Sequence, residues 1–261
     1  MDDSSGISND LFDRFERIPF HQLIGEQQMN RIDTKFPFHI SKLADVLTGL
    51  ESEYKIVEIE ESVVSPYISL YFDTPDDKFF NEHHNGIVNR AKVRYRSYPI
   101  TGTTFLEVKL KRNRGRTIKE RILSEELNFP FKKNQIEFIS RNLPNIDPSR
   151  LIPAVTVKYH RVSFISKAGE ERFSLDFNVN AQYENQNTHF GAVVILEVKQ
   201  DYKFRSPIIN RLRKTRIRKM SMSKYCLSSS RLKPDLKANL FKMTLRKLRK
   251  INNEIPLENE N

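Results

Sequence analysis

Positive charges alternate with apolar side chains along residues 90–96, and this pattern constrains the fold more than any other feature of the chain. Successive side chains of a β-strand point to opposite faces. One face of this segment would carry four cations in a row, namely Arg90, Lys92, Arg94 and Arg96. Neighbouring like charges repel one another, so such a row is tolerated best where a polyanion neutralises it. The segment therefore predicts a strand whose charged face binds an anion.

The same period-two pattern recurs along five further segments, at 104–111, 118–122, 155–161, 172–179 and 196–199. Their charged or polar faces contribute the candidate site residues Lys109, Lys119, Arg121, Tyr159, Arg161, Arg172, Glu197 and Lys199. An antiparallel sheet with one solvated face explains such alternation equally well. The uninterrupted row of cations favours a sheet that closes around an axis. We therefore predict an α+β fold, in which a closed antiparallel β-barrel has a charged lumen and short amphipathic helices packed outside.

Helix signals and composition set the organisation of the chain. Thr74-Pro75 and Ser206-Pro207 each pair an N-cap residue with a first-turn proline, which predicts two helix starts. No Gly/Ser-rich linker divides the middle of the chain, so we expect one domain with tails. The boundaries are a tail at 1–30, a tunnel domain at 31–230, and a basic amphipathic helix and tail at 231–261.

Charge points to anionic partners. The 261 residues carry a formal net charge of +11, which suits phosphates, nucleic acid or acidic lipid. No zinc-finger spacing or RNP1 motif occurs, so nucleic acid is not the expected partner.

The single cysteine fits a reducing compartment, and the N-terminal residues lack the order of a signal peptide, so we expect a cytoplasmic protein.

Nine short motifs follow one another along roughly residues 30–228. They are Arg31-x-Asp33-x-Lys35-Phe36, Tyr71-Phe72-Asp73-Thr74, Lys92-Val93-Arg94-Tyr95-Arg96, Leu106-Glu107-Val108-Lys109, Lys119-Glu120-Arg121, Tyr159-x-Arg161, Arg172-x-Ser174-x-Asp176, Leu196-Glu197-Val198-Lys199 and Ser223-Lys224-Tyr225. Together they resemble the polyphosphate polymerase domain of the vacuolar transporter chaperone (VTC) family, which belongs to the CYTH-like triphosphate tunnel enzymes. The resemblance implies a closed barrel that transfers the terminal phosphoryl group of ATP to a growing polyphosphate chain and releases ADP.

The resemblance also implies roles for individual residues. The phosphate path would be lined by Lys35, Arg94, Arg96, Lys109, Lys119, Arg161, Arg172, Lys199 and Lys224. The residues expected to act in catalysis are Arg94, Arg96, Lys109, Arg161 and Glu197. Glu197 would hold Mn²⁺ or Mg²⁺, a role that one carboxylate can fill together with substrate phosphates. Arg90, Lys92, Arg121 and Tyr159 are further candidates for substrate binding, and Tyr159 either packs a nucleotide base or fills the barrel wall.

Several alternatives remain open at this point. Related tunnel hydrolases begin with a Glu-x-Glu-x-Lys strand, whereas this chain has only Asp33 before Lys35, which favours polymerase over triphosphatase. Glu107 is either a second metal ligand or, as we favour, a salt-bridge partner. Rival functions are a metal-dependent triphosphatase or tripolyphosphatase, a non-catalytic polyphosphate sensor and a nucleic-acid binder. The C-terminal helix would cap the barrel, guide product, or contact a membrane surface as a peripheral partner.

Overall fold

The computed structural model describes residues 9–23, 32–112, 117–127, 129–169, 171–200 and 205–253. Arg31, which opens the first motif, lies outside the described residues. The strands are β1 Glu16–Pro19, β2 Ile32–His39, β3 Tyr54–Glu58, β4 Ser65–Asp73, β5 Arg90–Tyr98, β6 Thr103–Lys111, β7 Thr117–Ser124, β8 Ile152–Ser166, β9 Glu171–Tyr183, β10 Gln186–His189 and β11 Val193–Gln200. The α-helices are α1 Leu43–Leu47, α2 Lys78–His84, α3 Lys133–Asn142, α4 Pro207–Lys214, α5 Lys224–Leu232 and α6 Lys242–Asn252. Short 3₁₀ helices are η1 Asn9–Leu11, η2 Phe20–Leu23, η3 Ile40–Lys42, η5 Pro148–Arg150 and η6 Asn239–Phe241.

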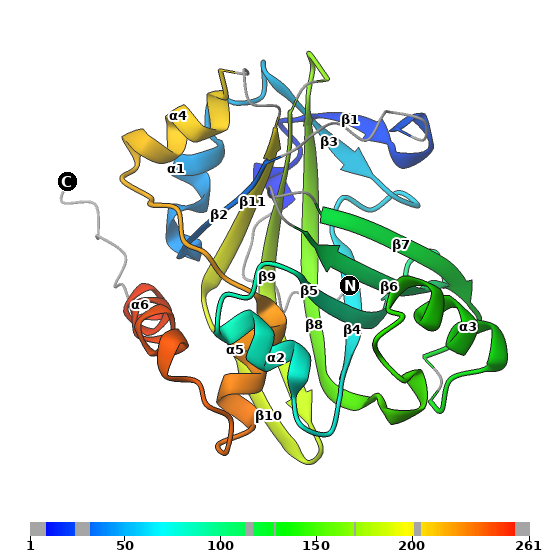
Figure 1. Ribbon diagram of the computed structural model, residues 1–261. Helices are drawn as coiled ribbons and strands as arrows, with labels where there is room; N and C mark the ends of the chain where they lie inside the picture. The colour runs from blue at the N-terminus through cyan, green and yellow to red at the C-terminus, as the bar shows by residue number, and fades with distance from the viewer. Residues whose placement is uncertain are drawn as a thin grey trace.

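In the described part of the chain, all strands belong to a single curved sheet. Its main order is β2-β11-β9-β8-β4-β5-β6-β7, and these neighbours pair antiparallel. The short strands β1, β3 and β10 attach at the side of this path. Figure 1 shows β5, β6 and β7 turning across the direction of the long strands β8 and β9. The antiparallel, sheet-rich α+β architecture expected from the alternation is therefore present.

The prediction of a closed barrel is wrong. Within the described ranges, β7 pairs with β6 alone and β2 with β11 alone, so the main path has two end strands that do not meet. Closure needs a ladder between the first and last strands, and this depends on strand tilt and stagger around the whole sheet. Side-chain alternation carries no information on tilt or stagger, because it is the same in an open and a closed sheet.

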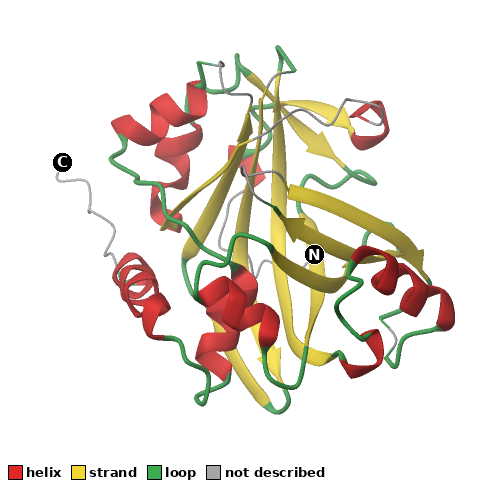
Figure 2. Ribbon diagram, in the orientation of Figure 1, coloured by secondary structure: helices red, strands yellow, loops and turns green. Residues whose placement is uncertain are grey.

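The apolar face of the sheet lies under helices, as predicted (Figure 2). One cluster packs Leu47 of α1 and Leu212 of α4 against Phe173 of β9. A second packs Ile139 of α3 against Val93 of β5. These helices pack on the face opposite the cations, whereas α5 packs on the charged face, where its Tyr225 ring stacks on Tyr71. None of the helices in the described residues is long and apolar enough to cross a membrane.

Two helix starts test the capping signals. At α4 the prediction is confirmed, since the Ser206 hydroxyl accepts a hydrogen bond from the Ile209 amide at 3.0 Å. At α2 the helix begins at Lys78, three residues after the predicted proline. The Thr74 hydroxyl accepts from the Lys78 amide, and the buried Asp73 carboxylate accepts from the next two amides. The prediction that Thr74 is the N-cap and Pro75 a first-turn residue is therefore wrong, because Asp77 is the N-cap and Thr74 reaches the helix across a longer turn.

The chain ends are partly integrated into the fold. In the segment expected as an N-terminal tail, β1 pairs parallel with β3, and Phe12 and Phe15 enter the core. At the other end, the basic helix expected within 231–261 is α6, which begins at Lys242. Leu248 of α6 is buried, so this helix packs onto the body of the protein.

Candidate functional site

The predicted cations of β5, β6 and β7 share one face of the sheet. Residues paired across neighbouring strands point to the same side. Arg94 pairs with Glu107, and Glu107 pairs with Arg121. In the next row, Lys92, Lys109 and Lys119 stand opposite one another, and Arg90 lies opposite Lys111. The register therefore gathers cations from three strands into adjacent rows.

The remaining strands continue the same face. Lys35 pairs with Glu197, and Lys199 pairs with Arg172. Arg161 pairs with Asp176. Tyr71 of β4 pairs with Arg94 of β5, so the face formed by β2, β11, β9, β8 and β4 continues onto β5, β6 and β7. We call this surface the basic face, defined by Lys35, Arg90, Lys92, Arg94, Arg96, Lys109, Lys119, Arg121, Tyr159, Arg161, Arg172, Glu197 and Lys199. Lys224, the first residue of α5, joins it from outside the sheet through Asp176.

A buried carboxylate, Glu107, organises the β5–β7 side of the basic face. Its side chain is 1% exposed and receives the Arg94 guanidinium at 2.6 and 2.8 Å and the Lys119 ammonium at 2.5 Å. Burial raises the pKa of Glu107, but the cations, Arg94 first, outweigh it and bring the pKa to about 2. Glu107 is thus an ion-pair partner for two cations in this structure.

Asp176 plays the same part on β9. Its carboxylate is fully buried and accepts two hydrogen bonds from the Arg161 guanidinium, at 2.6 and 2.8 Å. The Lys224 ammonium also contacts it. Burial raises the pKa of Asp176, while Arg161 and Lys224 lower it further than burial raises it. This ion triad fixes α5 against the sheet, because Lys224 is the first residue of that helix.

Glu197 differs from these two carboxylates because it keeps contact with solvent. Its side chain is 12% exposed, lies 3.2 Å from the Lys35 ammonium and 3.9 Å from the Arg161 guanidinium. Burial raises its pKa, but Lys35, Lys199 and other cations hold the pKa well below its usual range. An ionised, accessible carboxylate of this kind can bind a cation.

The donor set around Glu197 limits how a metal could bind. Across the described ranges, no group of three or more His, Cys, Asp or Glu side chains gathers to hold a metal ion. Mg²⁺ commonly binds through one or two carboxylates and completes its shell with waters and substrate phosphates. Glu197 therefore fits a metal that arrives with a phosphate substrate, and does not form an all-protein metal cage.

Tyrosines from β4 and β8 hold the central arginines, and two of them were missed as site residues by the sequence reasoning. The Tyr71 hydroxyl accepts from Arg94 at 3.0 Å, and the Tyr159 hydroxyl accepts from Arg96 at 3.0 Å. Tyr67 stacks on Tyr159 with ring centroids 5.3 Å apart, and the Tyr159 side chain is buried. The sequence signal that could have identified Tyr67 and Tyr71 is the alternation of side chains along residues 65–73. That alternation is harder to recognise because the segment has few charged residues.

The two halves of the basic face influence each other across the curved sheet. Burial lowers the pKa of Lys109 on β6, while the carboxylates of Asp33 on β2 and Glu197 on β11 oppose that fall. Strand β6, which neighbours the end strand β7, is therefore within electrostatic reach of β2 and β11 at the other end of the path, although β2 and β7 do not pair. Lys92 donates to the Ser223 hydroxyl at 2.9 Å, which ties β5 to the start of α5.

Arg90 and Arg121 lie toward the margins of the basic face. The Arg90 guanidinium donates to the Ile87 carbonyl at 2.6 Å. The Arg121 guanidinium lies over the Phe105 ring, 4.4 Å from its centroid, and remains exposed. Both residues can therefore reach an extended anion, but neither belongs to the buried ion pairs.

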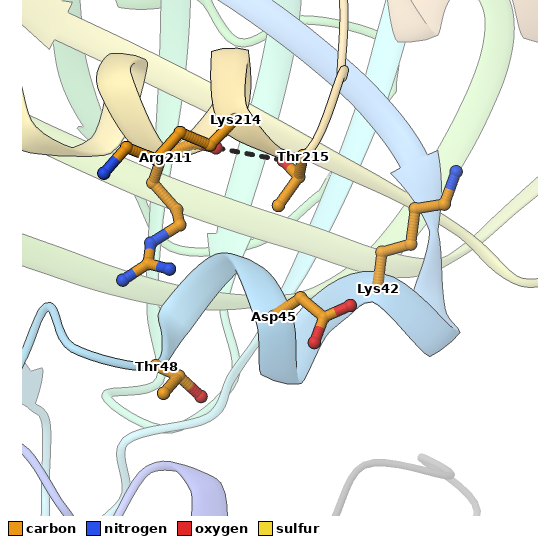
Figure 3. Close-up of a pocket in the computed structure, with 6 residues that line it drawn as sticks. All are labelled: Lys42, Asp45, Thr48, Arg211, Lys214 and Thr215. Carbon is orange, nitrogen blue, oxygen red and sulfur yellow. Dashed lines mark hydrogen bonds between the residues drawn. The ribbon is translucent and has the colours of Figure 1, made fainter. Parts of the chain in front are cut away.

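A separate pocket lies on the helix-covered side of the molecule (Figure 3). Side chains around α1 and α4 line it, namely Lys42, Asp45, Thr48, Arg211, Lys214 and Thr215. No residue of the basic face contributes to this pocket. Its position places it outside the candidate site.

Comparison with known proteins identifies the family. The sequence matches the VTC domain over residues 30–233, so the chain belongs to the VTC domain family. No curated protein matches it. The match spans all nine motifs, to which every residue of the basic face except Arg90 belongs.

Solved structures also share part of the arrangement. The PH1819 protein from Pyrococcus horikoshii OT3 is 12% identical, with a TM-score of 0.45 over 77% of this chain and 99% of that chain. A putative adenylate cyclase from Bacillus halodurans is 14% identical, with a TM-score of 0.47 over 75% and 96%. A putative adenylyl cyclase from Hippeastrum, described as having a dominant triphosphatase activity, is 12% identical, with a TM-score of 0.46 over 77% and 97%.

Proposed function

We propose that this protein is a polyphosphate polymerase that transfers the terminal phosphoryl group of ATP to the end of a polyphosphate chain. The observation that carries the proposal is the basic face, which gathers cations from seven strands. On it, buried carboxylates and tyrosines hold Arg94, Arg96, Lys119 and Arg161. Membership of the VTC domain family supports it. The implied partners are ATP and polyphosphate.

Phosphoryl transfer needs alignment and charge neutralisation more than covalent chemistry from the protein. An oxygen of the chain's terminal phosphate would attack the terminal phosphorus of ATP. A new P–O bond forms, the bond to the bridging oxygen breaks, and ADP leaves with the electron pair of that bond. The chain grows by one phosphate.

The basic face supplies two kinds of cation for this step. Arg94, Arg96 and Arg161 carry planar guanidinium groups that grip two phosphate oxygens at once. Their positions are preset by Glu107, Tyr159 and Asp176, so little reorganisation is needed when substrate binds. Lysines such as Lys109 and Lys119 act as mobile point charges along the phosphate path.

Glu197 would hold a divalent cation, Mn²⁺ or Mg²⁺, together with substrate phosphates. When bound, such a cation neutralises charge on the phosphate oxygens. Glu197 itself stays ionised because Lys35 and Lys199 lie nearby. Its contact with solvent leaves an approach for the metal–substrate complex.

Incubation of the purified protein with ATP and Mn²⁺ or Mg²⁺ tests the proposal. ADP, free phosphate and long-chain polyphosphate are followed together. ADP with polymer and little free phosphate is the expected result. Stoichiometric free phosphate without polymer would instead identify a triphosphatase that uses water as the acceptor. Tight polyphosphate binding without turnover would identify a sensor.

Arg94→Ala tests whether turnover occurs on the basic face. We expect it to lower turnover by at least roughly a hundredfold, because a charge-stabilising donor is lost. Lys119 still pairs with Glu107 in the variant, so the fold should persist. Arg141→Ala, on the exposed surface of α3, is the matched control. An Arg94→Ala protein as active as its parent would exclude the basic face as the active site.

A further inference from the structure

Helix α6 lies on the outside of the molecule (Figure 1). The exposed basic residues of this helix are Lys242, Arg246, Lys247, Arg249 and Lys250. No acidic residue occurs between positions 242 and 252. With nothing on the helix to neutralise them, these side chains form a surface complementary to an anion.

The orientation of α6 is fixed by packing on its other side. Leu248 is 1% exposed within an apolar cluster, and Leu245 and Ile251 pack against the same cluster. Near its C-terminal end, the Asn252 side-chain oxygen accepts a hydrogen bond from the Ala192 amide at 2.7 Å. Because the apolar side is occupied, the cations must face outward.

Two large apolar side chains stand exposed where α6 begins. Leu240 and Met243 are each 60% exposed. The Leu240 amide donates to Nε2 of His84 at 3.2 Å, which anchors this turn to α2. Leu240 lies in the 3₁₀ helix η6, and helix α6 starts two residues after it. The position of Leu240 at the surface is therefore fixed by the contact of its backbone with α2.

We propose that this α6 face, made of the five cations with Leu240 and Met243, binds the surface of a bilayer that contains anionic lipid. Helices that lie in a membrane interface combine a basic polar side with apolar side chains that enter the headgroup boundary. Lysine and arginine heads approach the lipid headgroups while their stems cover apolar surface. A soluble phosphate chain would satisfy the cations but offers no apolar region for Leu240 and Met243. This proposal does not depend on the proposed function.

The test is cosedimentation of the full chain with vesicles of phosphatidylcholine, with and without phosphatidylserine. We expect binding only to vesicles that contain phosphatidylserine. The triple variant Arg246→Gln/Lys247→Gln/Lys250→Gln should bind on the order of a hundredfold more weakly, since each cation near an anionic surface contributes about a fivefold factor. Replacing Leu240 and Met243 by serine should weaken binding by roughly tenfold or more.

A matched control separates the α6 face from overall charge. Lys133→Gln/Arg141→Gln/Arg150→Gln removes three exposed cations near α3 and gives the same net charge. This control should keep nearly all of the binding. Equal losses in the two triple variants would overturn the proposal, as would equal binding to vesicles without phosphatidylserine or no binding by the parent protein.

Discussion

Asp176 and Glu197 are two carboxylates on neighbouring strands of the same basic face, yet their surroundings differ. Asp176 is completely buried and contacts both Arg161 and Lys224. Glu197 is 12% exposed, with one ammonium at 3.2 Å and one guanidinium at 3.9 Å. The first is fully engaged by the protein, and the second retains capacity for another cation. A carboxylate on the basic face can therefore serve as an ion-pair partner within the protein or remain able to bind a further cation. Its degree of burial distinguishes the two cases.

This difference also revises the reason why a row of four cations is tolerated. The sequence argument invoked a bound polyanion. In the structure the row already has internal partners: Glu107 and Tyr71 for Arg94, Tyr159 for Arg96, and Ser223 for Lys92. The protein thus holds the cations in place without substrate, and a polyanion would add to an existing arrangement.

The largest effect should follow removal of the engaged carboxylate. Asp176→Asn leaves Arg161 and Lys224 without their buried counter-charge, which should lower the free energy of unfolding by about 3–5 kcal/mol. Urea denaturation measures this change. Added tripolyphosphate should recover part of the loss, since it supplies negative charge to the same cations. Asp235→Asn, at an exposed position, is the control. An Asp176→Asn protein as stable as this control would contradict the structural role of Asp176.

The same change at Glu197 should separate turnover from stability. Glu197→Gln should reduce metal-dependent turnover by roughly a hundredfold, because the charge that would hold the metal is lost. Its free energy of unfolding should fall less than that of Asp176→Asn, since the ion pairs of Glu197 are longer and partly solvated. Tripolyphosphate binding without metal should be retained. If binding and turnover fall together, Glu197 is an ion-pair partner like Asp176.

A smaller effect concerns the pH dependence of anion binding. Burial lowers the pKa of Lys119 to about 8 despite Glu107. Burial raises the pKa of Tyr71, but Arg94, Arg96 and Lys92 outweigh it and bring the pKa to about 8. As pH rises through about 8, Lys119 loses positive charge and Tyr71 gains negative charge. Affinity for tripolyphosphate should therefore fall, on the order of tenfold between about pH 7 and pH 9.

Calorimetric titration of two variants with tripolyphosphate shows which residue causes the fall in affinity at high pH. Lys119→Arg keeps its charge throughout this range, so it should bind more strongly than the parent above about pH 8. Tyr71→Phe removes the second titrating group and should flatten the remaining decline. An affinity that is constant with pH in the parent protein would show that neither group titrates on the basic face in this range.

Much of the site could be predicted because β-strand geometry is local. Alternation placed Arg94, Lys109, Lys119, Arg161 and Lys199 on charged faces before any pairing was known, and the register confirms that these faces coincide. Alternation fails where the register shifts between Lys158 and His160. Beyond that bulge Val179 joins a different apolar cluster from Phe173 and Leu175, because an extra residue exchanges the two faces.

The sequence by itself determined which side chains share a face and where α4 begins, because periodicity and capping act over a few residues. Only the tertiary structure decided that the sheet stays open, that Lys224 of α5 meets Asp176 of β9, and that Glu197 rather than Glu107 or Asp176 keeps contact with solvent. These outcomes depend on twist, register and packing between segments far apart in the chain, which determine both distance and burial.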